Sequence, residues 1–304
     1  MRFKKLDLNL LVALDHMLTL QSVSAAADKM FMSQSAMSNA LTRLRDYFGD
    51  PLLVQMGKRM VLTPQAEAMK DPLRDILVRV EATIETQPEF DPTVSNRSFN
   101  VLVSDYTLRV LMPLVVAEME RQGARCSLNM VAQKESPYLM LERGDADLLI
   151  TPDLFISSDH PSHFLFEDEY VVVAWSDGPH GNVDMDLTRY QETPHAIMVP
   201  PGSTSNPAET QLLAAAGITR NVDLTTFSFS ALPHLIVGTS RIATVHGHLA
   251  KAVMRHAPLV SYPLPFETGP FRQMVQWHSY RDRDPGIIWL RNVFANASDA
   301  LLLN

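Results

Sequence analysis

The residues best suited to recognise a charged polymer lie between Ser33 and Arg45. One helical face of this stretch carries short or forked hydrogen-bonding side chains, namely Gln34, Ser35, Ser38, Asn39, Thr42, Arg43 and Arg45. Such side chains reach base edges in the major groove of DNA, and arginine suits guanine or phosphate. The pattern predicts a DNA-recognition helix. An ordinary amphipathic surface helix is the alternative, but it would normally mix glutamate among its polar positions.

The elements that must position this face are helices. Ser33 is a natural N-cap for a helix from Gln34 to Tyr47. Its opposite side is an apolar stripe at helical spacing, made of Met37, Ala40, Leu41, Leu44 and Phe48. Two further helices are predicted before it, over 6–20 and 22–30, with Ser22 as the second cap and a turn at Phe31-Met32. Alanines at 25–27 allow two helices to cross closely. The segment is therefore predicted to be a helix-turn-helix.

A short hairpin is predicted directly after this motif. Leu52–Met56 and Met60–Leu62 are strand-like runs on either side of Gly57-Lys58-Arg59. A hairpin tip with Lys58 and Arg59 suits the phosphates or the minor groove beside a recognition helix. The N-terminal part thus reads as an all-α winged helix-turn-helix domain over 1–64.

Thr63-Pro64 predicts the start of a linker helix that runs to about Gln87. Apolar residues at alternating spacings of three and four form a seam, in which the expected dimerisation residues are Met69, Leu73, Ile76 and Val80. Such a stripe must be buried either on its own body or on a partner chain. A homodimer is favoured, because proteins that bind double-stranded DNA through one helix-turn-helix per chain usually bind two half-sites as a dimer.

Composition and charge set the broad class. The 304-residue chain is 46% hydrophobic and 20% charged, which is typical of a globular protein with more than one domain. Residues 1–65 hold eight Lys/Arg and five Asp/Glu, so this part carries +3 and the remainder −11 of the total −8. This asymmetry suits a small polyanion-binding domain attached to an acidic body. A single cysteine, no recognisable secretory signal and no long apolar run predict a cytoplasmic protein outside the membrane.

From residue 98 onward, apolar strand-like runs alternate with helical ones. The predicted strands are Phe99–Val103, Ser127–Val131, Asp147–Ile150, Tyr170–Trp175, His195–Val199, Val222–Phe227, Ile242–Val245, Leu259–Tyr262 and Met274–Trp277. The predicted helices are Leu108–Arg121, Pro137–Arg143, Pro207–Ala216, Leu232–Val237 and Leu249–His256. This alternation predicts an α/β architecture with parallel or mixed sheets.

The chain resembles the LysR-type transcriptional regulators over essentially its whole length. The resemblance is carried by Leu6-Asp7-Leu8-Asn9-Leu10-Leu11, Ser33-Gln34-Ser35-Ala36-Met37-Ser38, Asp284-Pro285-Gly286 and Trp289-Leu290-Arg291. Further segments resemble the branch of flavonoid-responsive nodulation regulators and regulators of aromatic-compound degradation: Met1-Arg2-Phe3-Lys4, Pro152-Asp153-Leu154-Phe155 and Val275-Gln276-Trp277. Many members of the family have proline at the position of Ser35. Serine is also tolerated at a helix N-terminus, so this departure does not affect the resemblance.

This resemblance implies a domain plan and a set of partners. After a linker over 65–90, residues 91–304 would form a two-lobed, periplasmic-binding-protein-like effector-binding domain. Lobe I would span about 98–166 and 271–304, and lobe II about 167–270. The implied partners are double-stranded operator DNA, a small effector, RNA polymerase and further copies of the chain, as a homodimer or a homotetramer. Activation rather than repression is implied, and no cofactor.

Effector-binding residues are expected just after the strands, because ligands of open α/β sheets bind beyond the carboxyl ends of strands. They are Ser104, Asp105, Tyr106, Thr151, Gly202, Ser203, Thr204, Phe227 and His246. The resemblance supports Ser104, Ser203 and Thr204 most, although a plain N-cap role is as good an interpretation for each. No Arg or Lys occurs at these strand ends, which favours a neutral or phenolic effector over a di-acid. Phe227, Phe229, Tyr106 and Trp277 would suit an aromatic ring or form part of the core.

Three other classes of protein, and a metal site, fit less well. An enzyme is disfavoured because no G-x-S-x-G, G-x-G-x-x-G or P-loop pattern occurs. A metal site is disfavoured because the His246/His248 and His160/His163 pairs lack cysteines or clustered carboxylates to complete a ligand set. A ligand-binding module alone would not need the helix-turn-helix, and an architectural DNA binder would not need a large acidic body.

Overall fold

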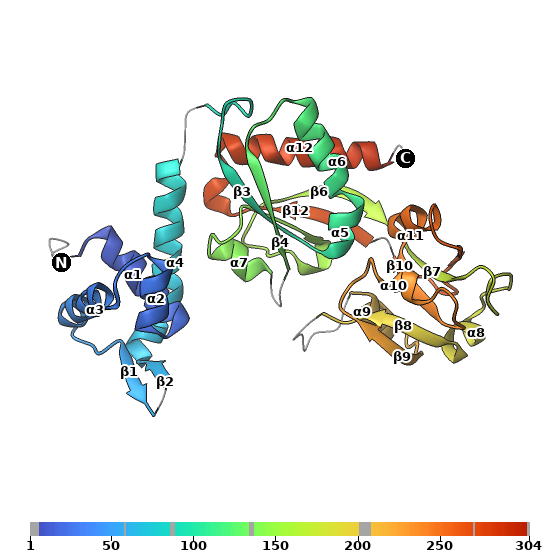
Figure 1. Cartoon of the computed structure of the whole chain (residues 1–304), viewed down its shortest axis with the longest axis horizontal. Coiled ribbons are helices and arrows are strands. Elements are labelled where there is room, and N and C mark those ends of the chain that lie inside the picture. Colours follow the sequence, from blue (N-terminus) through green and yellow to red (C-terminus); the bar gives the residue numbers. More distant parts are fainter. Residues whose placement is uncertain are drawn as a thin grey trace. The chain divides into compact units, whose positions relative to one another are not determined.

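A computed structural model describes residues 6–57, 59–85, 89–133, 137–200, 208–269 and 271–302 of the chain. The chain divides into two compact units, Met1–Thr86 and Gln87–Asn304 (Figure 1). Across the described residues, no helix combines the length and the apolarity needed to cross a membrane.

The first unit contains helices and one hairpin, in the predicted order. Its elements are α1 (Leu8–Leu20), α2 (Val23–Lys29), α3 (Gln34–Phe48), β1 (Leu53–Met56), β2 (Arg59–Leu62) and α4 (Pro64–Glu85). The side-chain oxygens of Ser22 and Ser33 accept hydrogen bonds from the backbone N–H groups of Ala25 and Ala36, at 3.2 Å each. These bonds confirm both predicted helix starts, because a capping serine satisfies an N–H that the helix leaves unpaired.

The core of this unit lies where α1, α2 and α3 meet. Met17, Met37 and Leu44 are fully buried there, and Ala26 and Ala27 are buried at the crossing for which small side chains were predicted. In the hairpin, Val54 pairs with Val61 and Met56 with Arg59. The three-helix core thus holds α3 in a fixed orientation.

The linker helix α4 packs on this same core, which corrects part of the predicted dimer seam. Leu73 is 7% exposed and contributes to the core of the first unit, and Met69 packs against that core. Arg74 of α4 also donates to the buried carboxylate of Asp15 in α1, at 2.6 Å. By contrast, Ile76 is 49% exposed. The apolar stripe of α4 therefore has two sides. The side with Leu73 is buried within the chain, and the side with Ile76 is exposed.

The second unit consists of two α/β lobes. Around the first sheet lie β3 (Ser98–Val103), α5 (Asp105–Val110), α6 (Met112–Arg121), β4 (Ser127–Ala132), α7 (Tyr138–Glu142), β5 (Leu148–Pro152), the 3-10 turn Asp153–Phe155, β6 (Ser162–Asp168), β12 (Phe271–Gln276), the 3-10 turn Ser279–Arg281 and α12 (Pro285–Leu302). Around the second sheet lie β7 (Tyr170–Trp175), α8 (Leu187–Glu192), β8 (Pro194–Met198), α9 (Ala208–Ala215), β9 (Asn221–Thr226), α10 (Leu232–Leu235), β10 (Ile242–His246), α11 (Gly247–Met254) and β11 (Leu259–Pro263).

Both sheets have five strands and are mixed. The first has the order β4-β3-β5-β12-β6, in which β3 is parallel to β4 and β5, and β12 is antiparallel to its neighbours. The second has the order β11-β7-β10-β8-β9, with β10 parallel to β8 and antiparallel to β7. The chain passes between the sheets from β6 to β7 and from β11 to β12. The α/β expectation is therefore confirmed.

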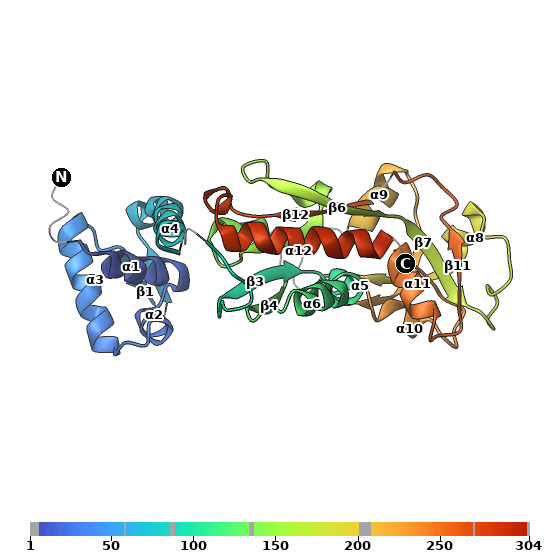
Figure 2. The same ribbon diagram turned by 90° about the horizontal axis from the view of Figure 1, so that it is seen from above.

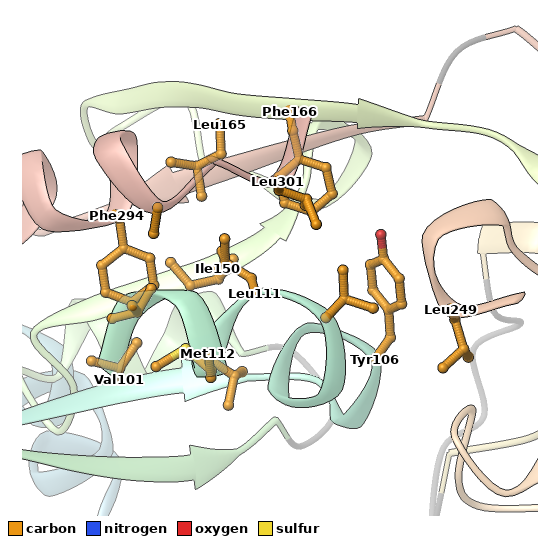
Figure 3. Close-up of a cluster of buried hydrophobic side chains, with 14 of the residues drawn as sticks. Val101, Tyr106, Leu111, Met112, Ile150, Leu165, Phe166, Leu249, Phe294 and Leu301 are labelled. Carbon is orange, nitrogen blue, oxygen red and sulfur yellow. The ribbon is translucent and has the colours of Figure 1, made fainter. Parts of the chain in front are cut away.

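One apolar core extends through both lobes. Val101, Ile150 and Phe294 lie in the first lobe, and the same cluster continues through Tyr106 of α5 to Leu249 of α11 in the second (Figure 3). The helix α12 contacts α6 and β6 along the first sheet (Figure 2). The two lobes therefore share buried side chains.

Several elements differ from prediction. The expected helix Leu108–Arg121 is interrupted at Leu111, because Pro113 lacks the N–H that would bond to the carbonyl four residues earlier. The expectation also omitted β6, α8 and the long C-terminal helix α12, although all three are present.

Candidate DNA-binding surface and effector site

The exposed face of α3 brings together most of the predicted DNA-binding residues. The side chains of Gln34, Ser35, Ser38, Asn39, Thr42 and Arg43 are all exposed, while Met37, Leu41 and Leu44 on the opposite face are buried. Ser33 caps the helix and lies 3.0 Å from Ser35 through their hydroxyl oxygens. Short donors and acceptors thus project from the first two turns of α3, which is the arrangement a major-groove helix uses.

The two arginines of α3 have different surroundings. Arg43 contacts Asp7 at 3.4 Å, with side chains that are 59% and 52% exposed, so this ion pair is weak and leaves the guanidinium accessible. Arg45 instead donates to the backbone carbonyls of Pro51 at 2.8 Å and Leu53 at 2.7 Å. The structure gives Arg45 a role within this unit, because its guanidinium holds Pro51 and the first residue of β1 against α3.

Replacing Arg45 by alanine is expected to lower the free energy of unfolding of the DNA-binding unit by about 1.5–3 kcal/mol, because two carbonyls lose a charged donor. The number of ions released on DNA binding is expected to stay the same. Thermal unfolding and the salt dependence of operator affinity would check both expectations. A salt slope reduced by about one, with unchanged stability, would show instead that Arg45 contacts phosphate.

The hairpin tip beside α3 presents Arg59, whose side chain is exposed at the start of β2. Gly57 turns the chain with φ of +64°, a left-handed conformation that glycine adopts without strain. Lys58, the other cation predicted for this tip, lies outside the described residues.

The predicted effector-binding residues at the end of β3 lie at the junction of the two lobes. Ser104 caps α5 by accepting from the backbone N–H of Thr107 at 3.1 Å. The Asp105 carboxylate accepts from the Ser228 hydroxyl at 2.6 Å and from the Ser230 backbone N–H at 3.0 Å. Ser228 and Ser230 follow β9 in the other lobe, so Asp105 connects the lobes directly.

Tyr106 and His246, two other predicted effector residues, are stacked on each other inside the molecule. Their ring centroids are 3.9 Å apart, and their exposed fractions are 1% and 2%. The Tyr106 hydroxyl donates to Asp168 at 2.6 Å, and burial followed by the Asp168 charge raises the pKa of Tyr106 well above its ordinary value. Burial also lowers the pKa of His246 to about 3, so its imidazole is neutral. This pair forms part of the junction between the lobes and is closed to solvent.

The remaining predicted effector residues differ in their exposure to solvent. Thr151 is buried at 1% exposure, whereas the ring of Phe227 is 74% exposed next to Ser228. Gly202, Ser203 and Thr204 lie outside the described residues. Trp277 is buried beneath the guanidinium of Arg291, at 3.7 Å from its carbon to the ring centroid, so it belongs to the core.

Sequence reasoning missed the groups that complete the junction. Asp168 was not predicted, because its role depends on Tyr106 and on the backbone N–H of His248, 3.2 Å from its carboxylate. Burial raises the pKa of Asp168, although the Tyr106 hydroxyl opposes that shift. The contact of Ser228 and Ser230 with Asp105 was also not predicted, because it joins residues far apart in the sequence.

The described residues give little support for a metal site or for a reactive cysteine. Within them, no group of three or more His, Cys, Asp or Glu side chains is placed to hold a metal ion. Cys126 is buried, and burial raises the pKa of its thiol. A protonated, buried thiol is a poor nucleophile, so Cys126 serves as a small apolar residue of the first lobe.

A winged helix-turn-helix followed in the chain by a two-lobed α/β domain defines a DNA-binding transcription regulator with an effector-binding domain. Residues 8–67 match the model of the bacterial regulatory helix-turn-helix protein, lysR family, and residues 94–299 match the LysR substrate binding domain. The chain belongs to the LysR family of transcription regulators. As a member of this family it binds operator DNA and a small-molecule effector, and it is not an enzyme.

Known proteins resemble it over nearly its whole length. Nodulation protein D 2 of Bradyrhizobium diazoefficiens is 39% identical over 293 residues, which cover 96% of this chain and 89% of that protein. A structure described as a probable transcriptional regulator from Pseudomonas aeruginosa shares 28% identity with a TM-score of 0.65, covering 97% of this chain and 98% of the other. A full-length OxyR variant from Pseudomonas aeruginosa has a TM-score of 0.72 at 15% identity, covering 96% and 94%, which shows a shared fold.

Proposed function

We propose that this regulator is an activator that binds a dyad operator as a homodimer, or as a tetramer of two dimers, and responds to a small aromatic or phenolic effector. The exposed polar face of α3 carries the proposal for DNA, with Ser33, Gln34, Ser35, Ser38, Asn39, Thr42 and Arg43 as its contacts and Lys58 and Arg59 on the hairpin. RNA polymerase would be contacted at the promoter, which places the protein in the cytoplasm.

The domain plan is part of this proposal. We assign 1–64 to the DNA-binding domain, 65–90 to the linker and 91–304 to the effector-binding domain. The compact units, which divide between Thr86 and Gln87, support a boundary near residue 90. Membership of the first sheet supports placing β6 and β12 in lobe I.

The dimer contact is assigned to the part of α4 that the core leaves uncovered. Ile76 is 49% exposed, Ile84 is 71% exposed, and Val80 is half-buried. Burying such side chains against a second copy removes apolar surface from water, which favours association. A dimer would also supply the two recognition helices that a dyad site needs.

The effector site is assigned to the accessible side of the lobe junction. Ser104, Asp105 and Phe227 are the predicted residues that remain available there, whereas Tyr106, Thr151 and His246 are buried. An exposed aromatic ring beside hydroxyl groups and a carboxylate suits a flat, hydroxyl-bearing effector. The resemblance to nodulation protein D relatives supports the same class, and Ser203 and Thr204 remain candidates.

Replacing Arg43 by alanine is expected to weaken operator affinity by about 5- to 150-fold if Arg43 reads a base, the range of one bidentate pair. If it binds phosphate, the salt slope is expected to fall by about one for each copy bound. Fluorescence anisotropy with labelled operator DNA across a salt series separates the two outcomes. Arg241→Ala, which removes a partly exposed cation of the second lobe, is the matched control. Unchanged affinity and slope in Arg43→Ala would remove this residue from the DNA contact.

Footprinting on the DNA upstream of the protein's own gene tests the effector class. Phenols, flavonoids and aromatic acids would be compared with aliphatic di-acids at constant salt. A protected dyad whose extent changes with a phenolic compound is the expected result. A change produced by aliphatic di-acids alone would contradict the proposed class and leave the DNA-binding assignment intact.

A further inference from the structure

Asp105 is a partly buried point at which a charged group of the first lobe reaches the second, besides the buried Asp168, which accepts from the backbone N–H of His248 in α11. Its Oδ2 atom accepts from the Ser228 hydroxyl at 2.6 Å, from the Ser230 backbone N–H at 3.0 Å and from the Ser230 hydroxyl at 3.1 Å. All three donors lie in the turn between β9 and α10. One carboxylate oxygen of Asp105 therefore accepts three hydrogen bonds from the second lobe.

This polar contact constrains the lobes in a way that the neighbouring apolar contact does not. Tyr106 of α5 and Leu249 of α11 belong to the shared core (Figure 3), and apolar packing is non-directional, so packed helices can slide by small amounts. Hydrogen bonds to a carboxylate are directional and strengthened by its charge. Asp105 therefore favours one registration of the two lobes at its side of the junction, as the buried Asp168 does through Tyr106 and the backbone N–H of His248.

The contact is also built to open. Asp105, Ser228 and Ser230 are each only partly buried, so water can replace every bond when the lobes separate. The turn keeps local support after opening, because the Ser228 hydroxyl also accepts from the Ala231 backbone N–H at 3.1 Å. A buried ion pair would lack this property, since separating it strands two charges.

We propose that Asp105 is an interlobe latch: its bonds to Ser228 and Ser230 hold the two lobes in one arrangement, and their release changes how the protein binds its operator. The second clause depends on the function proposed above, whereas the first concerns the effector-binding domain alone. An effector that offers hydroxyl groups to Asp105 would compete directly with the two serines.

The lobe arrangement is measured by distances between two spin labels on the full chain. With Cys126→Ala as background, Glu120→Cys on α6 and Thr225→Cys on β9 place one label on an exposed position of each lobe. Labelled protein is diluted into unlabelled chain, so that only distances within one chain are recorded. The unmodified latch is expected to give one narrow distribution without any effector.

Two variants break the latch from opposite sides. Asp105→Ala removes the acceptor, and the double variant Ser228→Ala/Ser230→Ala removes both hydroxyl donors and tests the latch even if the first variant does not fold. Both are expected to broaden the distribution toward longer distances. Asp223→Ala is the control, because it removes an exposed carboxylate whose partner Arg241 is in the same lobe. Unchanged distances in both latch variants, or equal broadening in the control, would overturn the latch.

Operator footprints of the same proteins, recorded without effector, test the regulatory part. The latch variants are expected to alter the protected length, as release by an effector would. An altered distance distribution with an unaltered footprint would overturn the link from lobes to DNA. If no variant and no unmodified protein protects the operator, the proposed function fails, while the distance measurement still decides whether the latch exists.

Discussion

Replacing Arg220 by alanine is expected to destabilise the effector-binding domain by about 3–5 kcal/mol, because a buried carboxylate loses its partner. Arg220 forms an ion pair with Glu209 at side-chain exposures of only 6% and 7%, and a second guanidinium nitrogen lies 3.3 Å from Thr210. Glu209 belongs to the first turn of α9, whose Leu213 is buried beside Tyr190. The pair therefore fixes α9 over the second sheet.

This loss should appear as a fall of about 6–20 °C in the melting temperature, since 1 kcal/mol corresponds to about 2–4 °C in a domain of this size. Tryptophan fluorescence of the full chain reports it selectively, because Trp175, Trp277 and Trp289 all belong to the second unit. Arg241→Ala is the matched control: its pair with Asp223 is about one-third exposed, so its loss should cost under about 1 kcal/mol. Equal shifts in the two variants would contradict the argument.

Local signals explain why the DNA-binding domain could be predicted closely. Ser22, Ser33 and Thr63 each cap the helix that follows. In each case the side-chain oxygen accepts a hydrogen bond from a backbone N–H three residues later, so the bond depends only on neighbouring residues. A signal of the same kind precedes α12. Asp284 accepts from the Gly286 backbone N–H at 2.9 Å, and Pro285 occupies the first helical position. That helix could have been predicted from the sequence.

Contacts between distant residues could not be predicted in this way. Asp105 lies 123 positions from Ser228, and no local pattern of either residue indicates the other. Arg45 has the type and spacing of a DNA contact, but the backbone carbonyls of Pro51 and of Leu53, the first residue of β1, lie against its guanidinium. Leu73 fits a dimer seam and a domain core equally well, because both require an apolar residue at helical spacing. Tertiary packing decides such cases.

Acidification is expected to destabilise the effector-binding domain once the pH falls below 6.5, because His195 and His246 are buried in the neutral form. Burial lowers the pKa of His246 from 6.5 to about 3 and that of His195 from 6.5 to about 4. Each folded-state pKa lies below the unfolded one, so the stabilisation is complete above pH 6.5 and is lost as the pH falls toward the folded value. Each histidine should then contribute a slope of about 1.4 kcal/mol per pH unit.

His246→Phe is expected to remove about 1.4 kcal/mol per pH unit from this slope. The imidazole is stacked on Tyr106 at 3.9 Å between centroids and lies near Phe229, Phe271 and Tyr170, so another aromatic ring suits the position. The two tyrosines are the titratable groups that face it, and both stay neutral because burial raises their pKa values. Urea unfolding followed by tryptophan fluorescence from about pH 7 to about pH 4.5 would give the two slopes. Equal slopes in the variant and the unmodified protein would mean that His246 accepts a proton in the folded state.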